Sequence, residues 1–266
     1  FTAGGAIRVQ RNMQIDAGGT YNHAGQTLTF GGVGSVDAAT ITDSNGGTQD
    51  LGAVTIDAVG HTKNAATDLL MSSLTISNGT FASAANAVEV GGIVTGIGTW
   101  TAGAGTVTVG GDFDLSTFTA SSSVSYFSGS SIVFDTFTAN GGRIELSGAA
   151  NQTLDAGPTA IFYDLRVNKT AGTATFQTDD INLSAGGTLT VSDSAGTTFQ
   201  TAVNVPNLVL TGTTGTIAFN NNLDVTSGLT NAGGSFDLTF NGAAGGQTTT
   251  VAGNTTLGTS GTVQLG

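Results

Sequence analysis

Apolar and polar residues alternate in short stretches along the chain, and glycine-rich joints separate these stretches. The alternation is clear in residues 106–109, 144–146, 165–167 and 189–191. A period of two places apolar side chains on one face of a β-strand and polar side chains on the other. The joints hold glycine pairs at 91–92, 110–111, 141–142, 186–187, 233–234 and 245–246. Because glycine reaches positive φ without steric cost, these pairs predict sharp corners between short strands.

Phenylalanine recurs at nearly constant spacing from the middle of the chain onwards. The series is Phe113, Phe134, Phe176, Phe199, Phe219 and Phe240, with gaps of 21, 42, 23, 20 and 21 residues. Leu154 lies where the gap of 42 residues would be halved. A period of about 20–22 residues fits one coil of a β-solenoid, in which three short strands and three turns form each coil. The series therefore predicts an internal ladder of stacked large side chains.

The same repeat favours a β-solenoid over a β-sandwich. A sandwich also has short strands and frequent turns, but it does not require a phenylalanine at every interval of about 21 residues. Stacked equivalent coils put like residues above one another, so we expect an all-β, right-handed parallel β-helix with coils of about 20–22 residues. We expect a single β-solenoid over residues 1–266, with the clearest register in 98–266 and a less regular pattern in 1–97. Residues 65–73 are the best helical candidate, and this stretch is short.

The composition of the chain argues against several classes of binding partner. Charged residues make up 9% of the chain, against about 25% in an average domain, whereas a hydrophobic share of 38% indicates a folded chain. The net charge is −12 with only six scattered Lys and Arg, which argues against nucleic acid and an anionic membrane surface. The acids are all Asp except Glu89 and Glu145, and Asp favours turns over helices.

Several features are compatible with export. The chain has no Cys, which excludes a disulfide framework without deciding the compartment. No apolar run approaches the ~18 residues of a transmembrane helix, so we expect no membrane span. The sequence opens at Phe1 without a basic segment, which we interpret as a mature product or a fragment without its signal peptide.

Residues 98–172 resemble a repeat of very large secreted bacterial surface proteins. The resemblance rests on residues 98–101, 105–109, 151–154 and 161–167, and the tail from Gly233 through Gln264 is similar to the Gly/Thr-rich repeats of filamentous-haemagglutinin-like β-helical adhesins. The resemblance implies an exported chain at the cell surface, a right-handed β-helix, and a role in adhesion, matrix or envelope structure. Its motifs specify strands and turns and imply no particular binding site.

Histidine and carboxylate positions are the first candidates for catalysis. His23 and His61 lie near no nucleophile motif and no zinc-type spacing, which indicates turn histidines. The carboxylate candidates are Asp112 with Asp114 and Asp179 with Asp180. Glycoside hydrolysis needs two carboxylates about 5–10 Å apart, and parallel β-helices include polysaccharide-degrading enzymes. Because Asp is also a common turn residue, we expect no catalytic residues and no enzyme.

Two further patterns point to ligands. Residues 31–37 approach the Gly-Gly-x-Gly-x-Asp calcium motif, but the Asp comes one residue late and the motif occurs once, whereas calcium β-rolls need tandem copies. We expect no cofactor or metal-binding residues, with weak surface binding of Ca²⁺ left open. Thr-x-Thr pairs, which ice-binding solenoids carry on one flat face, occur at Thr27/Thr29, Thr40/Thr42, Thr106/Thr108 and Thr188/Thr190. Their spacing is irregular, so ice binding remains a minor alternative to strand propensity.

Two functions of different classes remain, together with a third of lower rank. The first is a non-catalytic structural segment or subunit of an extracellular fibre, sheath or matrix, in which open solenoid ends promote self-association or continue a longer chain. The alternative is an adhesin stalk that binds a glycan or host surface, with a patch near Trp100 or Tyr163. The third is a polysaccharide-degrading enzyme. Glycosylation sequons occur at Asn78, Asn151, Asn168, Asn182 and Asn254, as chance allows in an Asn- and Thr-rich chain.

Overall fold

The chain is all-β, and its parallel strands stack as a β-solenoid with coils about 20 residues apart. The structure is a computed structural model that describes residues 1–192, 195–211, 215–231, 237–240, 249–252, 254–256 and 262–265. The described residues contain no helix, and the helical candidate at residues 65–73 is instead the end of one strand and the whole of the next. The predicted fold class is confirmed. The described residues also include no helix with the length and hydropathy needed to cross a membrane.

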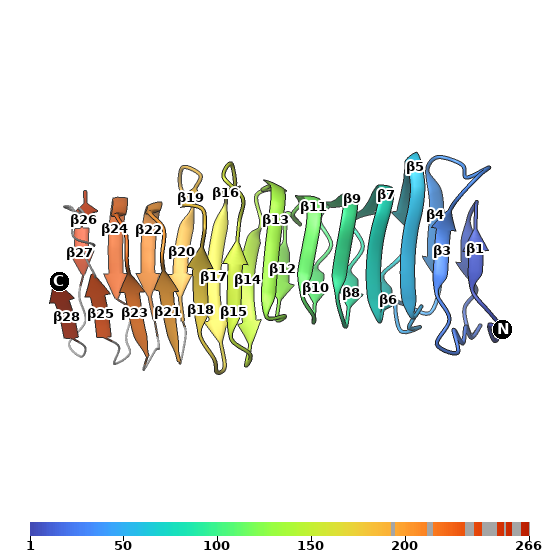
Figure 1. The fold of residues 1–266 in the computed structure, drawn as a ribbon, viewed down its shortest axis with the longest axis horizontal. Coiled ribbons are helices and arrows are strands. Elements are labelled where there is room, and N and C mark those ends of the chain that lie inside the picture. The colour runs from blue at the N-terminus through green and yellow to red at the C-terminus, as the bar shows by residue number, and fades with distance from the viewer. Residues whose placement is uncertain are drawn as a thin grey trace. The chain divides into compact units, whose positions relative to one another are not determined.

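Two compact units make up the chain, Phe1–Gly129 and Ser130–Gly266. In each unit, strands that follow one another by one coil pair in parallel, as the succession of strands in Figure 1 shows. Parallel pairing of equivalent strands places each residue about 4.8 Å from its counterpart in the next coil. The glycine pairs expected at 233–234 and 245–246 lie outside the described residues.

Three faces form the first unit. The first face consists of β1 (Ile7–Val9), β3 (Leu28–Gly31) and the first parts of β5 (Ala53–Ala65), β7 (Ser73–Ala84), β9 (Val94–Ala102) and β11 (Phe113–Thr119). The second face consists of β2 (Met13–Ile15), β4 (Ala39–Asp43) and the last parts of β5, β7, β9 and β11. The third face consists of β6 (Leu69–Met71), β8 (Val88–Val90), β10 (Val107–Val109) and β12 (Val124–Phe127). The long strands therefore turn a corner, where their register shifts.

Large side chains fill the interior of the first unit behind its second face. Phe81, Trp100 and Phe118 are fully buried, and each successive pair of rings lies 5.7 Å apart. The Trp100 indole Nε1 donates a hydrogen bond to Ser83 Oγ at 3.3 Å. Lys63 occupies the equivalent position one coil earlier, is fully buried, and donates from Nζ to the Val36 carbonyl at 2.6 Å. Burial lowers the pKa of Lys63 because it disfavours the charged form, and the Asp37 charge opposes this shift.

The second unit has the same three-faced construction. Its first face consists of β13 (Ser131–Thr138), β15 (Gln152–Asp155), β18 (Ala174–Gln177), β21 (Gly196–Phe199), β23 (Thr216–Phe219), β25 (Asp237–Phe240) and β28 (Thr262–Leu265). Its second face consists of β16 (Ile161–Phe162), β19 (Ile181–Leu183), the first parts of β22 (Val203–Leu210) and β24 (Leu223–Asn231), and β26 (Thr249–Val251). Its third face consists of β14 (Arg143–Gly148), β17 (Asp164–Lys169), β20 (Thr188–Val191), the last parts of β22 and β24, and β27 (Asn254–Thr256).

The predicted phenylalanine ladder exists in the second unit. Successive rings of Phe176, Phe199, Phe219 and Phe240 lie 4.5, 4.8 and 5.7 Å apart in nearly parallel stacks. Leu154 pairs in register with Phe176, which confirms its place in the ladder. The ladder stacks each ring on the next because successive coils keep the same register along this face.

One member of the predicted series, Phe134, lies elsewhere. Ile132, not Phe134, pairs with Leu154, and Phe134 instead contacts Phe137 with ring centroids 5.1 Å apart. Phe113 lies in the first unit, where it pairs with Val94. The assignment of Phe134 was wrong because the coils differ in length, so a constant spacing along the chain does not guarantee the same position on a coil.

The early part of the chain has a regular register in the structure. Along the first face of the first unit, equivalent residues pair from one coil to the next over β3, β5, β7, β9 and β11: they are Leu28, Val54, Leu74, Val94 and Phe113. All five are buried. Aliphatic residues occupy most of these positions, so the repeat lacks the phenylalanine that marks it in the second unit.

Candidate functional site

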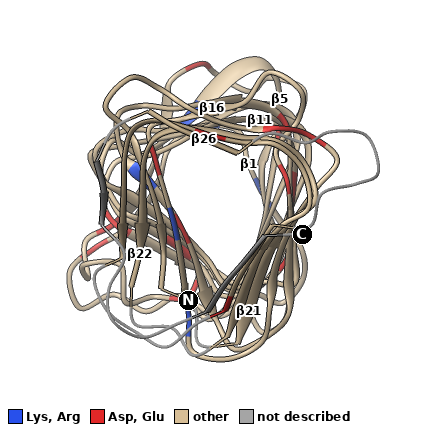
Figure 2. Ribbon diagram, turned by 90° about the vertical axis from the view of Figure 1, so that its left-hand side faces the viewer, with Lys and Arg blue, Asp and Glu red and all other residues tan. Residues whose placement is uncertain are grey.

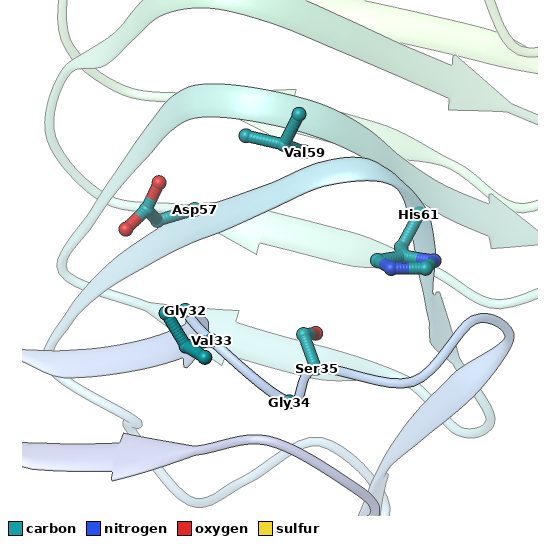
Figure 3. A pocket seen from close by; sticks show the side chains of 7 residues that line it. All are labelled: Gly32, Val33, Gly34, Ser35, Asp57, Val59 and His61. Carbon is teal, nitrogen blue, oxygen red and sulfur yellow. The ribbon is translucent and has the colours of Figure 1, made fainter.

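A pocket of the first unit lies at the corner between its first and second faces. It has a volume of about 340 Å³ and lies between a glycine-rich loop after β3 and the bend in the middle of β5 (Figure 3). The lining residues are Gly32, Val33, Gly34, Ser35, Asp57, Val59 and His61. Val33 and Val59 form its apolar part and are 95% and 72% exposed. We call this site the corner pocket.

Glycine is required in the loop because the neighbouring coil lies against its backbone. Gly31 has a φ of 137°, and a Cβ at this position would lie 1.8 Å from the Asp57 carbonyl oxygen. Gly32 donates its backbone N–H to that same oxygen at 2.8 Å. The glycine-rich stretch that resembles a calcium motif therefore forms a close backbone contact between two coils.

Asp37, the acidic residue of that motif, is engaged by backbone donors. Its Oδ1 accepts a hydrogen bond from the Thr62 N–H at 2.7 Å. The pKa of Asp37 is lowered chiefly because the Thr62 and Ala38 N–H groups stabilise the carboxylate. Among the residues that the structure describes, no three His, Cys, Asp or Glu side chains gather in a group that could hold a metal ion.

Some polar groups of the corner pocket have hydrogen-bond partners within the protein, and others do not. Asp57 Oδ2 lies 3.4 Å from Arg8 Nη1, and Asp57 Oδ1 accepts a hydrogen bond from Asn78 Nδ2 at 3.1 Å. Ser35 Oγ is buried and has no partner in the protein. In Figure 3 the Ser35 and His61 side chains both rise beside the space between loop and bend. The pocket therefore offers a free hydroxyl and an imidazole beside two apolar groups, and its carboxylate is already paired.

His23, the other histidine, meets a carboxylate and a hydroxyl from later coils. Its Nε2 lies 3.9 Å from Asp50 Oδ2, and Ser72 Oγ donates to the same oxygen at 2.7 Å. Its Nδ1 accepts the Gly25 N–H at 3.0 Å. The carboxylate lies between hydroxyl and imidazole, whereas nucleophilic catalysis requires the imidazole in the middle. This arrangement can fasten coils together, and sequence reasoning missed it because the residues are far apart along the chain.

The adjacent Asp179 and Asp180 do not form the main carboxylate pair of the second unit. Asp179 instead lies near Asp155 from the previous coil, and the two carboxyl groups interact electrostatically. Burial, followed by Asp155 and the Asp180 charge, raises the pKa of Asp179. The other predicted pair, Asp112 and Asp114, lies exposed at the start of the first part of β11.

An ionic network on the third face of the second unit was not expected from the sequence. Arg143 Nη2 lies 3.0 Å from Glu145 Oε2, and Asn168 Nδ2 donates to Glu145 Oε1 at 2.7 Å. Arg166 pairs in register with Glu145 and donates from Nη2 to Asn168 Oδ1 at 3.4 Å. Arg166 Nε is buried without a partner. The residues come from neighbouring strands, so only the coil register brings them together.

An aromatic pocket of about 400 Å³ lies in the second unit. Its lining residues are Phe137, Thr138, Ala139, Gly141, Thr159, Ile161, Tyr163 and Ser184. Tyr163 is 42% exposed and Ile161 is 53% exposed, while Ser184 Oγ is buried without a partner in the protein. No Asp, Glu, Lys, Arg or His lines it. We call this site the tyrosine pocket.

The two aromatic residues expected near a ligand patch behave differently. Tyr163 lines the tyrosine pocket and is accessible. Trp100 is fully buried between Phe81 and Phe118, so its own side chain is not available to a ligand patch near it. The inward-pointing position of a strand decides this outcome, since residues 99 and 101 then point outward.

Comparison with known proteins gives no family. No family model matches the chain, and no curated protein and no solved structure matches it either.

Proposed function

We propose that the chain is a non-catalytic segment or subunit of an extracellular surface fibre, sheath or matrix. The observation that carries the proposal is the regular stacking of coils whose large side chains lie in the core. Outward positions hold mainly short uncharged residues, as in Thr29, Thr55 and Thr75, which pair in register on the first unit. Figure 2 shows few Lys and Arg positions on the described coils. Such a surface suits close packing between chains, because little charge must be desolvated.

The resemblance to filamentous-haemagglutinin-like repeats supports the location that we propose, which is the cell surface. Self-association is the property that distinguishes a fibre or sheath element from a passive stalk. Exposed apolar side chains at the corner of the first unit supply a contact, since Val33, Val59 and Ile97 are 95%, 72% and 77% exposed. Exposed apolar groups that cluster on a surface favour association.

Electron microscopy of the purified chain, together with sedimentation at increasing concentration, tests the proposal. We expect ordered filaments or a lattice with the chain as the repeating unit. Substitution of Val59 and Ile97 by Lys should weaken assembly, because it places charge on the exposed apolar corner. The control replaces Glu89 and Thr108 by Lys on the third face and should assemble as the wild type does. Dispersed monomers at all concentrations would contradict the proposal.

The tyrosine pocket favours a second candidate function, recognition of a glycan. An exposed aromatic ring beside hydroxyl groups, without charged side chains, suits the apolar face and hydroxyls of a neutral sugar. A glycan array followed by calorimetry with the best sugar tests this function. We expect Tyr163→Ala to abolish binding and Tyr126→Ala, a tyrosine outside the pocket, to retain it. Equal binding by both variants, or binding to no sugar, would rule this function out.

A further inference from the structure

Threonine residues form an ordered array on the second face of the first unit. One column contains Thr62, Thr80, Thr99 and Thr117, which pair in register over four successive strands. The adjacent column, two residues further along each strand, contains Asn64, Ala82, Thr101 and Thr119, with Thr40 before Asn64. We call these two columns the threonine array. It differs from the Thr-x-Thr pairs that the sequence alone suggested.

The strand pattern fixes the direction of these side chains. Between the two columns lie Lys63, Phe81, Trp100 and Phe118, which are fully buried. Because neighbouring residues of a strand point to opposite faces, the flanking array residues point outward. Thr101 is exposed, and the other threonines of the two columns are half-buried by their neighbours.

Buried aromatic side chains in the interior of the first unit support the threonine array. The buried rings of Phe81, Trp100 and Phe118 pack against one another under it. The register of residues 99–101 with the strands on either side is unbroken across the array positions. Threonine is also stiff at χ1 in a strand. Little conformational entropy is therefore left to lose when a ligand contacts the array.

The hydroxyl groups of the array are free to contact a ligand. None of the six threonines of Thr62, Thr80, Thr99, Thr101, Thr117 and Thr119 uses its hydroxyl in a hydrogen bond within the protein. Strand geometry places them about 4.8 Å apart between coils and about 6.6 Å apart along each strand. Each threonine offers one methyl and one hydroxyl at each of these points.

From this geometry we propose that the threonine array binds ice. The two repeat distances set by the backbone are of the same order as the spacings of oxygen atoms in the ice lattice. The hydroxyl groups can occupy positions that water molecules have in the ice lattice. The methyl groups between them release disordered water when they contact ice. The array contains no charged residue, so no strongly hydrated ion interrupts the ordered layer.

Other ligands fit the array less well. It has no cation to pair with phosphate or carboxylate groups, and no exposed aromatic ring on which a sugar could stack. A repeating solid surface is the ligand that benefits most from equivalent groups at equal intervals, because each additional threonine repeats the same contact.

The test uses the full chain in ice recrystallisation and ice-affinity partition assays. The array variant carries Thr80→Lys and Thr99→Lys, which place two charges in the middle of the first column. The control carries Thr75→Lys and Thr95→Lys on the same strands, β7 and β9, but on the first face. We expect the wild type and the control to partition into ice and to inhibit recrystallisation. The array variant should need about tenfold or more protein for the same inhibition.

A milder pair of substitutions covers the case in which the lysine variant fails to fold. Thr99→Ser and Thr117→Ser keep the hydroxyls and remove two methyls, so they should weaken ice inhibition while circular dichroism stays unchanged. Exclusion of the wild type from growing ice would overturn the proposal. Equal loss of inhibition in the array variant and the control would also overturn it, because the two faces would then be equivalent.

Discussion

Close approach of neighbouring coils constrains individual residues in this chain. Where the backbone of one coil lies against the next, only glycine fits, and Gly31 shows this with both a positive φ and a short Cβ distance. Where a carboxyl group is buried beside a carboxylate of the previous coil, as Asp179 is beside Asp155, burial and the neighbouring charge raise the pKa of Asp179. Both effects arise from coil stacking, and each leads to a prediction for a single substitution.

Gly31→Ala is expected to destabilise the first unit. The residue has a φ of 137°, and an added Cβ would meet the Asp57 carbonyl oxygen at 1.8 Å. An unfavourable backbone conformation alone costs about 1–3 kcal/mol, and the contact adds to this cost. Urea denaturation measures the loss. The control is Gly5→Ala, where an added Cβ meets no atom within 4 Å, and it should change the free energy of unfolding by less than about 0.5 kcal/mol.

Asp179→Asn is expected to stabilise the second unit at neutral pH. Because the folded pKa of Asp179 is raised, the folded state binds its proton more tightly than the unfolded state does. The wild type therefore loses stability as pH rises from the unfolded pKa of about 3.9 through the raised folded value. Melting temperatures between pH 3 and neutral pH should show the advantage of the variant shrinking as the pH falls. An advantage that does not vary with pH, or a less stable variant at neutral pH, would contradict this linkage; Asp114→Asn controls for removal of a negative charge.

At the scale of the element, each strand is stabilised by its counterparts in neighbouring coils. A strand of three to five residues buries too little apolar surface to persist alone. In the second unit the rings of Phe176, Phe199 and Phe219 share this burial through stacking at 4.5 and 4.8 Å. The central ring contacts both neighbours and should therefore matter most.

Phe199→Ala should cost about 3–5 kcal/mol, because it leaves a cavity between two stacked rings. Phe199→Leu should cost less, because it keeps most of the apolar volume and loses mainly the ring contacts, which are worth about 0.5–1.5 kcal/mol each. Urea denaturation followed by circular dichroism compares the two. Thr198→Ala is the matched control on the outward side of β21, and it should change stability little. Similar costs for Ala and Leu would show that ring stacking, and not volume, dominates.

At the scale of the whole molecule, stacking makes the free energy of unfolding of each coil depend on its neighbouring coils. Each coil contacts its neighbours, so the free energy of unfolding is approximately a sum of coil and interface contributions. This additivity can be tested in the first unit. Trp100 lies on the inward side of β9, the strand that pairs with β7 and β11.

Trp100→Ala should therefore produce a graded loss of amide protection. Removing the indole should cost about 3–5 kcal/mol locally. Hydrogen exchange followed by mass spectrometry should show the largest loss in β7, β9 and β11, and a smaller loss in β1 and β3. An equal loss in every strand of the first unit would indicate all-or-none unfolding and contradict the coil-by-coil description. Thr95→Ala, on the outward side of β9, is the control.

Local patterns in the sequence were sufficient to predict the fold class. The alternation of apolar and polar residues depends only on the two-residue period of a strand, and the phenylalanine spacing depends only on coil length. Phe176, Phe199, Phe219 and Phe240 accordingly stack as predicted. The composition alone likewise shows that the chain has few charged residues and many short polar residues.

Only the tertiary structure decided which residues share a place on a coil. Coils of unequal length shift the register, so Phe134 leaves the ladder. Trp100 takes an inward-pointing strand position and is therefore buried in the core. The same register aligns Thr62, Thr80, Thr99 and Thr117, whose intervals of 18, 19 and 18 residues differ from the period that the phenylalanine series predicted. Sequence determines the period and direction of each strand, whereas contacts between coils depend on how each corner bends, which is set by packing against the neighbouring coil.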